Sequence, residues 1–260
     1  MTVDTITQGD CLELLRTLPD GCADMVLTDP PYGTTSAKFD TPFDLAAWWK
    51  EIWRIAKPGA AILTFGQEPF SSRMRMAGGK FRYDWIWEKH VGAGFLNANK
   101  MPLRAHEVVS VFYSKLPTYN PQKWKGKAYG FKARRTQSEN YPNVKYTDIN
   151  NTDGVHYPRD VLFFEKPKHY YGERSFDEPC HPQQKPTALL EYFIRTYTDE
   201  GQLVVDPFMG SGSTAVAAIR TGRHFVGFER EDRWMEAAER RIREARGEVD
   251  RKEVEMERDC

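Results

Sequence analysis

The chain has 260 residues, of which 40% are hydrophobic and 28% charged, and its 37 Lys and Arg balance its 37 Asp and Glu. This composition is sufficient for a sizeable core and excludes a wholly disordered chain. Because the formal net charge is zero, any nucleic acid must be bound by a local basic surface and not by the field of the whole molecule.

The four cysteines and the N-terminal segment narrow the class of protein further. The cysteines are scattered, without the spacing of a metal site or a disulfide framework, so we expect reduced thiols and no metal. The first residues lack the layout of a signal peptide, and no apolar run is long enough to cross a bilayer. We therefore expect a soluble, cytoplasmic protein without membrane contact.

Strand-like and helix-like stretches alternate over the first hundred-odd residues, as in a parallel sheet covered by helices. The apolar run at 24–28 predicts a strand, which ends at Asp29-Pro30-Pro31 because proline cannot continue a strand ladder. Apolar residues at three- and four-residue spacing predict a helix over 45–56, ended by Lys57-Pro58-Gly59. Further strands are expected at 60–65, 83–87 and 108–113.

The sequence changes character between about 115 and 180, where periodicity fades and basic residues interleave with aromatic ones. The cations, opposed by few acids before Asp148, are Lys115, Lys123, Lys125, Lys127, Lys132, Arg134, Arg135 and Lys145. The aromatic residues among them are Trp124, Tyr129, Phe131 and Tyr141. A solvated loop would explain the cations alone, whereas the mixture favours contact with phosphates and stacking on bases.

Regular structure returns after His181. The spacing of apolar residues predicts a helix around 188–197, then a strand at 202–205 that runs into a glycine-rich turn. A helix at 215–220 and a strand at 224–228 are expected next. From 231 to 259 we expect a charged, solvated helix that frays at its end, with a partner-binding helix as the alternative.

The glycine-rich turn at 204–214 joins a strand to a helix, and its glycines let backbone N–H groups approach a ligand. It matches neither the dinucleotide fingerprint nor the P-loop, so a nucleotide-like ligand without a phosphate requirement fits better. Glu229 ends the next strand, near the spacing at which an acid bonds the hydroxyl pair of a ribose. Taken alone, Glu229 would be interpreted as a surface acid.

Two segments, LTDPPYG at 27–33 and DPFMGSGST at 206–214, resemble motifs IV and I of the DNA amino-methyltransferases. Their order, with the catalytic motif first, resembles the circularly permuted β class found among restriction-modification and phage methylases. Gly9-Asp10 resembles motif III, and HPQQKP at 181–186 resembles motif X, which usually reads HPTQKP. The departures, Gln183 for Thr and Ser213 for Thr, remove no carboxylate or glycine that the site requires.

The resemblance covers nearly everything except about 115–180 and the tail after 240. It implies an α/β fold with a Rossmann-like, seven-stranded, mostly parallel methyltransferase sheet, circularly permuted, with an inserted target-recognition region. The strands that end at Asp29 and Asp206 should be neighbours, since ligands bind at the carboxyl ends of strands at the switch point. The implied segments are a catalytic half (1–114), an inserted DNA target-recognition region (115–180), a cofactor-binding half (181–240) and a charged helical tail (241–260).

The implied activity is transfer of a methyl group from S-adenosylmethionine to N6 of adenine in double-stranded DNA, by direct displacement after base flipping. The Asp29 carboxylate and the Pro30 carbonyl would accept the two amino N–H groups, and Tyr32 would stack on the base. The expected catalytic residues are Asp29, Pro30, Pro31 and Tyr32. The residues expected around the cofactor are Asp10, Cys11, Asp29, Gln184, Lys185, Asp206, Pro207, Phe208, Gly210, Ser211, Gly212, Ser213 and Glu229.

Several alternatives stay open. Asp at the first position of motif IV favours adenine, because N4-cytosine enzymes more often carry Ser there, but N4-cytosine transfer is the main chemical alternative. A catalytically silent DNA-binding protein of the same fold is another, against which the intact Asp29 and Asp206 argue. A non-methylating nucleotide-binding enzyme is a third. The loop at 89–104 lines the DNA side of the pocket in one interpretation, and a homodimer is left open because many relatives dimerise.

Overall fold

The computed structural model describes residues 1–34, 40–131, 149–166 and 183–258. Several basic and aromatic residues of the predicted target-recognition region, and two residues of the predicted motif X, lie outside the described residues: Lys132, Arg134, Arg135, Tyr141, Lys145, His181 and Pro182. The chain divides into two compact units, one formed by Met1–Asn120 with Asp160–Cys260 and the other by Pro121–Arg159. The described part of the chain contains no helix that is long and apolar enough to span a membrane.

A single large sheet organises the larger unit. In spatial order its eight strands are β1 (Thr5–Gln8), β12 (His224–Glu229), β11 (Leu203–Asp206), β2 (Ala23–Thr28), β3 (Ala56–Gly66), β5 (Arg104–Phe112), β4 (Phe81–Ala93) and β10 (Val161–Phe163). Neighbouring strands are parallel except where β5 pairs with β3 and with β4. The predicted α/β fold with a large, mostly parallel sheet is confirmed, whereas the circular permutation stays a prediction.

The sheet has one strand more than the seven expected. Strand β10 pairs in parallel with the outer edge of β4, where Val161 lies opposite Ile86. Its three residues come from the stretch 115–180 and are all apolar, so no alternation of apolar and polar residues marks a strand there. Leu162 packs against the core, whereas Val161 and Phe163 are exposed.

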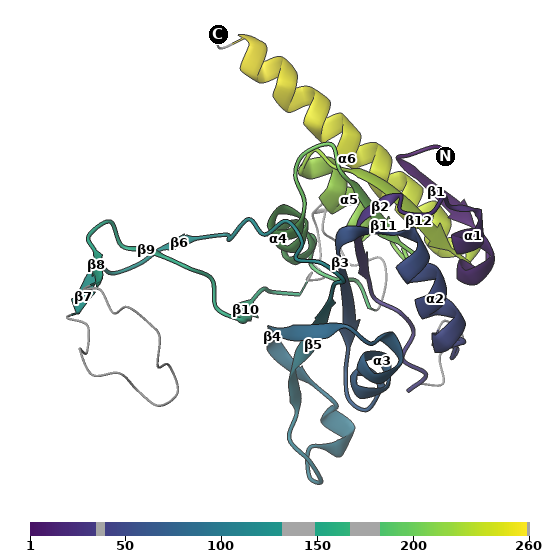
Figure 1. The fold of residues 1–260 in the computed structure, drawn as a ribbon, viewed down its shortest axis with the longest axis horizontal. Helices are drawn as coiled ribbons and strands as arrows, with labels where there is room; N and C mark the ends of the chain where they lie inside the picture. The colour runs from purple at the N-terminus through teal and green to yellow at the C-terminus, as the bar shows by residue number, and fades with distance from the viewer. Residues whose placement is uncertain (35–39, 132–148, 167–182, 259–260) are drawn as a thin grey trace. The chain divides into compact units, whose positions relative to one another are not determined.

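Helices cover both faces of the sheet (Figure 1). The α-helices of the described residues are α1 (Cys11–Thr17), α2 (Leu45–Ile55), α3 (Phe70–Gly78), α4 (Thr187–Tyr197), α5 (Ser213–Arg220) and α6 (Asp232–Arg258), and a 3-10 turn, η1, spans Phe95–Asn97. Helices α1, α2 and α3 pack in one core cluster and α4, α5 and α6 in the other. Strand β2 supplies both clusters, since Val26 points into the first and Met25 and Leu27 into the second, as the two-residue period of a strand requires.

Helix α2 has a capped start, and its end runs directly into β3 without the predicted loop. Asp44 caps α2 by accepting hydrogen bonds from the N–H groups of Ala46 and Ala47, both at 3.0 Å. The helix ends at Ile55, and the Lys57-Pro58-Gly59 segment already belongs to β3. Pro58 is tolerated there because it lies on an exposed early part of the strand.

The prediction of a solvated C-terminal helix was wrong for the first half of α6. An apolar stripe at three- and four-residue spacing is buried against the larger unit: Trp234, Ala238, Ile242 and Ala245. Arg241 is buried on the same helix, and its guanidinium donates to the Ser211 carbonyl at 2.8 Å and to the Ser213 hydroxyl at 2.9 Å. Numerous charged residues on the remaining faces of α6 mask this stripe in the sequence.

The smaller unit consists, in its described part, of two short antiparallel pairs. Strand β6 (Trp124–Lys125) pairs with β9 (Val155–His156), and β7 (Tyr129–Phe131) pairs with β8 (Ile149–Asn151). The rings of Trp124 and His156 stack with centroids 4.5 Å apart. Aromatic and basic residues are thus brought together within this unit, and its predicted role in target recognition is taken up below as a proposal.

Replacing Arg241 by alanine should destabilise the protein because the buried oxygens of Ser211 and Ser213 lose their donor. We expect the free energy of unfolding to fall by about 2–4 kcal/mol, measured by urea denaturation. Arg240→Ala is the matched control, since Arg240 is exposed on the same helix and its loss should change stability by less than about 0.5 kcal/mol. Equal stability of the two variants would contradict a structural role for Arg241.

Candidate active site

Two strands far apart in the sequence bring the site together. Strands β2 and β11 are parallel neighbours, with Met25 opposite Val204 and Val26 opposite Val205. Their carboxyl ends, Thr28 and Asp206, therefore meet at the same edge of the sheet, and the Thr28 hydroxyl donates to the Asp206 carboxylate at 2.7 Å. The predicted adjacency of these two strands is confirmed.

A cavity of about 520 Å³ opens at this edge, a volume in the range of small-molecule sites. The predicted site residues that line it are Asp10, Cys11, Asp29, Pro30, Pro31, Tyr32, Gln184, Lys185, Asp206, Pro207, Phe208, Gly210, Ser211, Ser213 and Glu229. Gly212 does not line the cavity. Residues from separate sequence motifs thus line one cavity.

The Asp206 carboxylate organises the glycine-rich turn from inside. Besides Thr28, it accepts the Thr214 hydroxyl at 2.6 Å and the Phe208 N–H at 3.0 Å, so it joins β11, the turn and the start of α5. Burial raises the pKa of Asp206 to about 6, although these donors oppose the shift. Asp206 therefore shapes the cavity through contacts within the protein.

Two glycines of the turn have positive φ, for two different reasons. Gly210 has a φ of 53°, and a Cβ built on it would meet nothing within 4 Å, so this backbone faces open space. Gly212 has a φ of 80°, and a Cβ there would lie 3.0 Å from the Ala238 backbone. Gly212 thus allows α6 to pack closely on the start of α5, which explains its place behind the cavity wall.

Glu229 closes the turn from the next strand. Its carboxylate accepts the N–H groups of Gly210 at 2.9 Å and of Arg230 and Glu231, both at 2.8 Å. Burial raises the pKa of Glu229, and the backbone donors oppose that rise. The carboxylate is therefore fixed in place at the cavity, where its remaining lone pairs can accept hydrogen bonds from hydroxyl groups.

Asp10 and Cys11 stand at the start of α1. Asp10 caps this helix by accepting from the N–H groups of Leu12 at 2.9 Å and Glu13 at 3.2 Å. Burial, together with the nearby Asp10 carboxylate, raises the pKa of Cys11 to about 12. The thiol therefore stays protonated and offers the cavity an apolar contact, not a nucleophile.

The loop after β2 carries Asp29 and Tyr32. The Tyr32 hydroxyl donates to the Asp29 carboxylate at 2.7 Å, and its ring lies 5.0 Å from that of Phe70, tilted by 30°. Burial raises the pKa of Tyr32 well above its usual value, which keeps the hydroxyl neutral and a donor. Asp40 anchors the following residues, since its carboxylate accepts the N–H groups of Gly33 at 2.7 Å and Thr34 at 2.8 Å.

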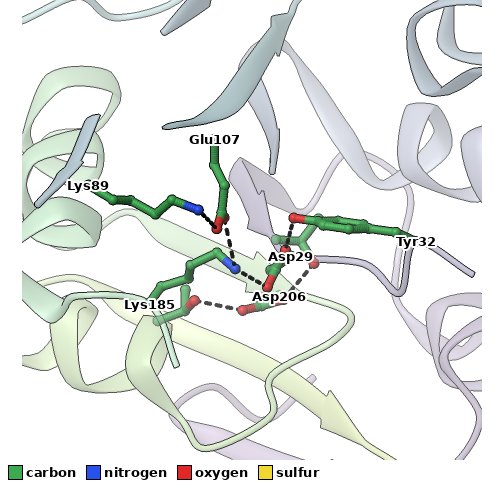
Figure 2. A network of polar contacts seen from close by, with 8 residues as sticks. Asp29, Tyr32, Lys89, Glu107, Lys185 and Asp206 are labelled. Atoms are coloured by element: carbon green, nitrogen blue, oxygen red, sulfur yellow. Dashed lines mark hydrogen bonds and ion pairs between the residues drawn. The ribbon is translucent and has the colours of Figure 1, made fainter. Parts of the chain in front are cut away.

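Asp29 also belongs to a buried network of charges, which Figure 2 shows converging from three parts of the chain. The Lys185 ammonium forms an ion pair with the second oxygen of Asp29 and lies 3.3 Å from the Glu107 carboxylate. The Lys89 ammonium lies 3.1 Å from the other Glu107 oxygen. The side chains of Lys89 and Glu107 are 0% and 5% exposed, so two carboxylates and two ammonium groups share one desolvated space.

Lys185 and Glu107 favour each other's ionised forms, whereas burial dominates at Asp29. Burial alone would lower the pKa of Lys185, but the Asp29 and Glu107 carboxylates outweigh it and raise that pKa. Burial favours neutral Glu107, yet Lys185 and Lys89 bring its pKa below the usual value. For Asp29 burial dominates and raises the pKa, with the Lys185 ammonium opposing. Lys185 is thus the cation that opposes the protonation of a buried Asp29 carboxylate.

Glu107, Thr28 and Arg241 were not predicted as functional residues from the sequence, and Lys89 was predicted only as the first residue of a loop beside the pocket, which it does line. Glu107 lies opposite Trp87 in the antiparallel pairing of β5 with β4, and Lys89 follows Trp87 on the same face of β4. Such diagonal neighbours meet only once the register of the two strands is known. The sequence contains one signal, a charged residue next to the apolar residues of each strand. It contains nothing that pairs Lys89 with Glu107.

Comparison with known proteins agrees with this arrangement. A family model described as DNA methylase, for enzymes that modify N6 or N4 amino groups, matches residues 23–240. The chain belongs to this N6/N4 DNA methylase family. It is 27% identical over 243 residues to the putative methylase YubD of Escherichia coli strain K12, covering 90% of this chain and 88% of that protein.

Solved structures share the fold of this family member. The chain matches the M1.HpyAVI complex with S-adenosylmethionine with a TM-score of 0.61 and 22% identity, covering 92% of this chain and 98% of the other. It matches the cytosine-N4-specific PvuII DNA methyltransferase with a TM-score of 0.63 and 19% identity, covering 92% and 86%. The chain is therefore a DNA methyltransferase of the N6/N4 type, and its target base is considered below.

The raised pKa of Asp206 predicts a distinctive dependence of stability on pH. Between its ordinary value of 3.8 and its folded value of about 6, the folded protein binds the proton more tightly than the unfolded chain. The free energy of unfolding should therefore fall as pH rises through this window, by up to about 3 kcal/mol. Urea denaturation of the cofactor-free protein from pH 4 to 7 measures this.

Asp206→Asn is the comparison, because an amide keeps the shape of the side chain, still accepts the Phe208 N–H, and does not titrate. The stability of the wild type relative to this variant should decline from pH 4 to 6 and then level off. Parallel stability curves for the two proteins would show that Asp206 titrates normally.

Glu107→Gln should destabilise the protein strongly, because two buried ammonium groups then lose the carboxylate between them. Breaking a buried ion pair on one side costs about 3–5 kcal/mol, which urea denaturation at pH 7 would detect. Glu88→Gln is the matched control, since Glu88 is exposed on the neighbouring strand. Adding Lys89→Met to Glu107→Gln should restore part of the loss, and a network without energetic coupling would show additive effects instead.

Proposed function

We propose that this methyltransferase transfers a methyl group from S-adenosylmethionine to N6 of adenine in double-stranded DNA. The observation that carries the proposal is the position of the Asp29 carboxylate, which lies in the same cavity as the glycine-rich turn and Glu229. A group that polarises an amino group and a backbone cradle for a nucleotide-like cofactor thus face one space.

The cavity residues suit S-adenosylmethionine in chemistry as well as in volume. We assign the ribose hydroxyls to the fixed carboxylate of Glu229, and the adenine to the surroundings of Asp10 and Phe208. The open backbone at Gly210 leaves room for close approach of the ligand, since no neighbour lies within 4 Å of a Cβ built there. When bound, the cofactor supplies an electrophilic methyl group on a sulfonium.

Asp29 would prepare the amino group of the base. The nitrogen lone pair of adenine N6 is delocalised into the ring, so it attacks poorly until acceptors aligned with both N–H bonds localise it. A carboxylate has about four acceptor positions, and Asp29 uses two of them for Tyr32 and Lys185. Capacity remains for one amino N–H, and the Pro30 carbonyl is the acceptor for the other.

Lys185 and Glu107 would act on the reaction through Asp29. Lys185 orients the Asp29 carboxylate and opposes the protonation that burial favours, while the same ammonium is shared with Glu107. A fixed, preorganised acceptor needs no rearrangement as charge develops on the amino nitrogen. Once that nitrogen has gained its fourth bond it becomes a strong acid, so its proton leaves after transfer and Asp29 need not act as a base on the neutral amine.

Tyr32 would provide the flat surface for the flipped base. Stacking of a base on an aromatic ring returns about 1–3 kcal/mol, a substantial part of the few kcal/mol that base flipping costs. The ring is backed by Phe70, which fixes its plane. The hydroxyl, meanwhile, donates to Asp29, so the same residue aligns the acceptor and stacks on the substrate.

We assign recognition of the DNA sequence to the smaller unit. Its described part exposes Trp124, Tyr129 and Tyr157, and the Lys123 ammonium lies 4.7 Å from the Tyr157 ring centroid. Lysines and aromatic rings on short strands can contact phosphates and bases. The neutral net charge of the chain makes such a local basic surface necessary for DNA binding.

The test of the function uses tritiated S-adenosylmethionine and mixed-sequence duplex DNA, followed by digestion to nucleosides. We expect the label in N6-methyl-2′-deoxyadenosine. Label in N4-methyl-2′-deoxycytidine would establish the alternative that the similarity to the cytosine-specific PvuII enzyme supports. The absence of label on any DNA would count against catalysis and for a silent DNA-binding protein of the same fold.

Asp29→Ala should lower kcat by about 10²–10³-fold, the usual cost of removing one preorganised group that stabilises developing charge. Asp29→Asn should retain more activity, because an amide oxygen still accepts one N–H, whereas a general base would lose its function in both variants. Asp250→Ala is the control, since Asp250 is exposed on α6. Full activity of Asp29→Ala would refute the polarising role.

A further inference from the structure

The hairpin that joins β4 to β5 exposes large apolar side chains on its tip. Phe95 is 81% and Leu96 is 95% exposed, and Val91, Met101 and Leu103 are also exposed. Soluble proteins rarely gather so many exposed apolar side chains in one place unless they bind a partner there.

The tip is an ordered turn. The N–H of Asn97 donates to the Gly94 carbonyl at 2.9 Å, that of Ala98 to Phe95 at 3.0 Å, and that of Lys100 to Asn97 at 2.8 Å. These bonds form the 3-10 turn η1, which begins at Phe95. Phe95 and Leu96 are therefore presented outward on a defined scaffold.

The base of the hairpin is part of the cavity wall. Ala93 and Arg104 lie opposite each other across the β4–β5 pairing, and both line the cavity, as do Lys89 and Glu107 nearer the sheet. The ten residues from 94 to 103 thus extend beyond the rim of the candidate active site, and Figure 1 shows this hairpin reaching past the neighbouring strands. The tip therefore continues from two strands whose ends line the cavity.

The charge of the hairpin indicates the kind of partner. Between Glu88 and Glu107 the sequence contains no Asp or Glu, while Lys100, Arg104 and the two histidines His90 and His106 are exposed. An apolar tip with basic flanks and no acids suits a polyanion that also offers an apolar interior. Duplex DNA has both properties, phosphates outside and stacked bases within.

We propose that Phe95 and Leu96 insert into the base stack of the duplex and fill the gap left by the base that enters the cavity. This inference rests on the proposed function, because a gap forms only if a base is flipped out of a duplex. The wedge would hold the duplex open while Tyr32 and Asp29 bind the extruded base. Lys100 and Arg104 would contact the phosphates on either side of the insertion.

The double variant Phe95→Ala/Leu96→Ala tests the wedge. Its rate of methyl transfer to duplex DNA should fall at least about tenfold, because the open duplex loses its support. On the same DNA after heat denaturation, where no stack has to be opened, its rate should stay within about twofold of the wild type. Met76→Ala/Leu116→Ala is the matched control, since these residues are 86% and 80% exposed elsewhere, and it should behave like the wild type on both DNAs.

Phe95→Trp adds an independent arm that does not require activity on single strands. A larger flat ring can fill the same gap, so this variant should keep at least half of the wild-type rate on duplex DNA and its indole fluorescence should be quenched on binding. Equal losses on duplex and denatured DNA, or a double variant as active as the wild type on duplex DNA, would overturn the wedge. The wedge would also be overturned if the wild type is a dimer and the double variant is a monomer, because the tip would then bind a second copy of the chain. A wild type inactive on every DNA would instead refute the proposed function.

Discussion

Lys185 is shared between two carboxylates, and the rest of the site depends on that sharing. It reaches Asp29 at the end of β2 and Glu107 on β5, so one ammonium group joins strands from two regions of the sheet to the segment that precedes α4. A buried ammonium group that pairs with a single carboxylate cancels the charge of that carboxylate. A buried carboxylate without a cation beside it would take up a proton. Lys185 opposes the protonation of Asp29 that burial and Glu107 favour, and because Lys185 is shared with Glu107, Asp29 keeps acceptor positions that face the cavity.

The order of the strands in the sheet brings these groups together. Because β2 lies between β11 and β3, its carboxyl end has the glycine-rich turn on one side and β3 on the other, and beyond β3 follow β5 with Glu107 and β4 with Lys89. Asp206 fixes the first side through three hydrogen bonds, and the charge network fixes the second. Asp29 therefore stands between a binding surface and an electrostatic support, and each is held by contacts within the protein.

The sequence predicts the site residues that lie next to a recognisable strand end. It does not predict those whose partners are set by strand register or by helix packing. Asp29, Tyr32 and the glycines of the turn follow directly on apolar strands, so the pattern alone puts them at the sheet edge. Glu107 and Arg241 carry no such mark, because their partners lie on other elements and were fixed only by the β4–β5 pairing and the packing of α6 on α5. Strand β10 was missed for a different reason, since its three residues are all apolar and too few to show an alternating pattern in the sequence.

The charges that are buried at the site cannot attract DNA. The paired charges of Lys89, Glu107, Lys185 and Asp29 largely cancel, and the whole chain has no net charge. Attraction to a phosphate backbone therefore requires exposed cations, and the described chain offers them in the acid-free hairpin around Lys100 and on the smaller unit at Lys123, Lys125 and Lys127. The buried charges orient one carboxylate, whereas we assign the attraction of DNA to the exposed cations.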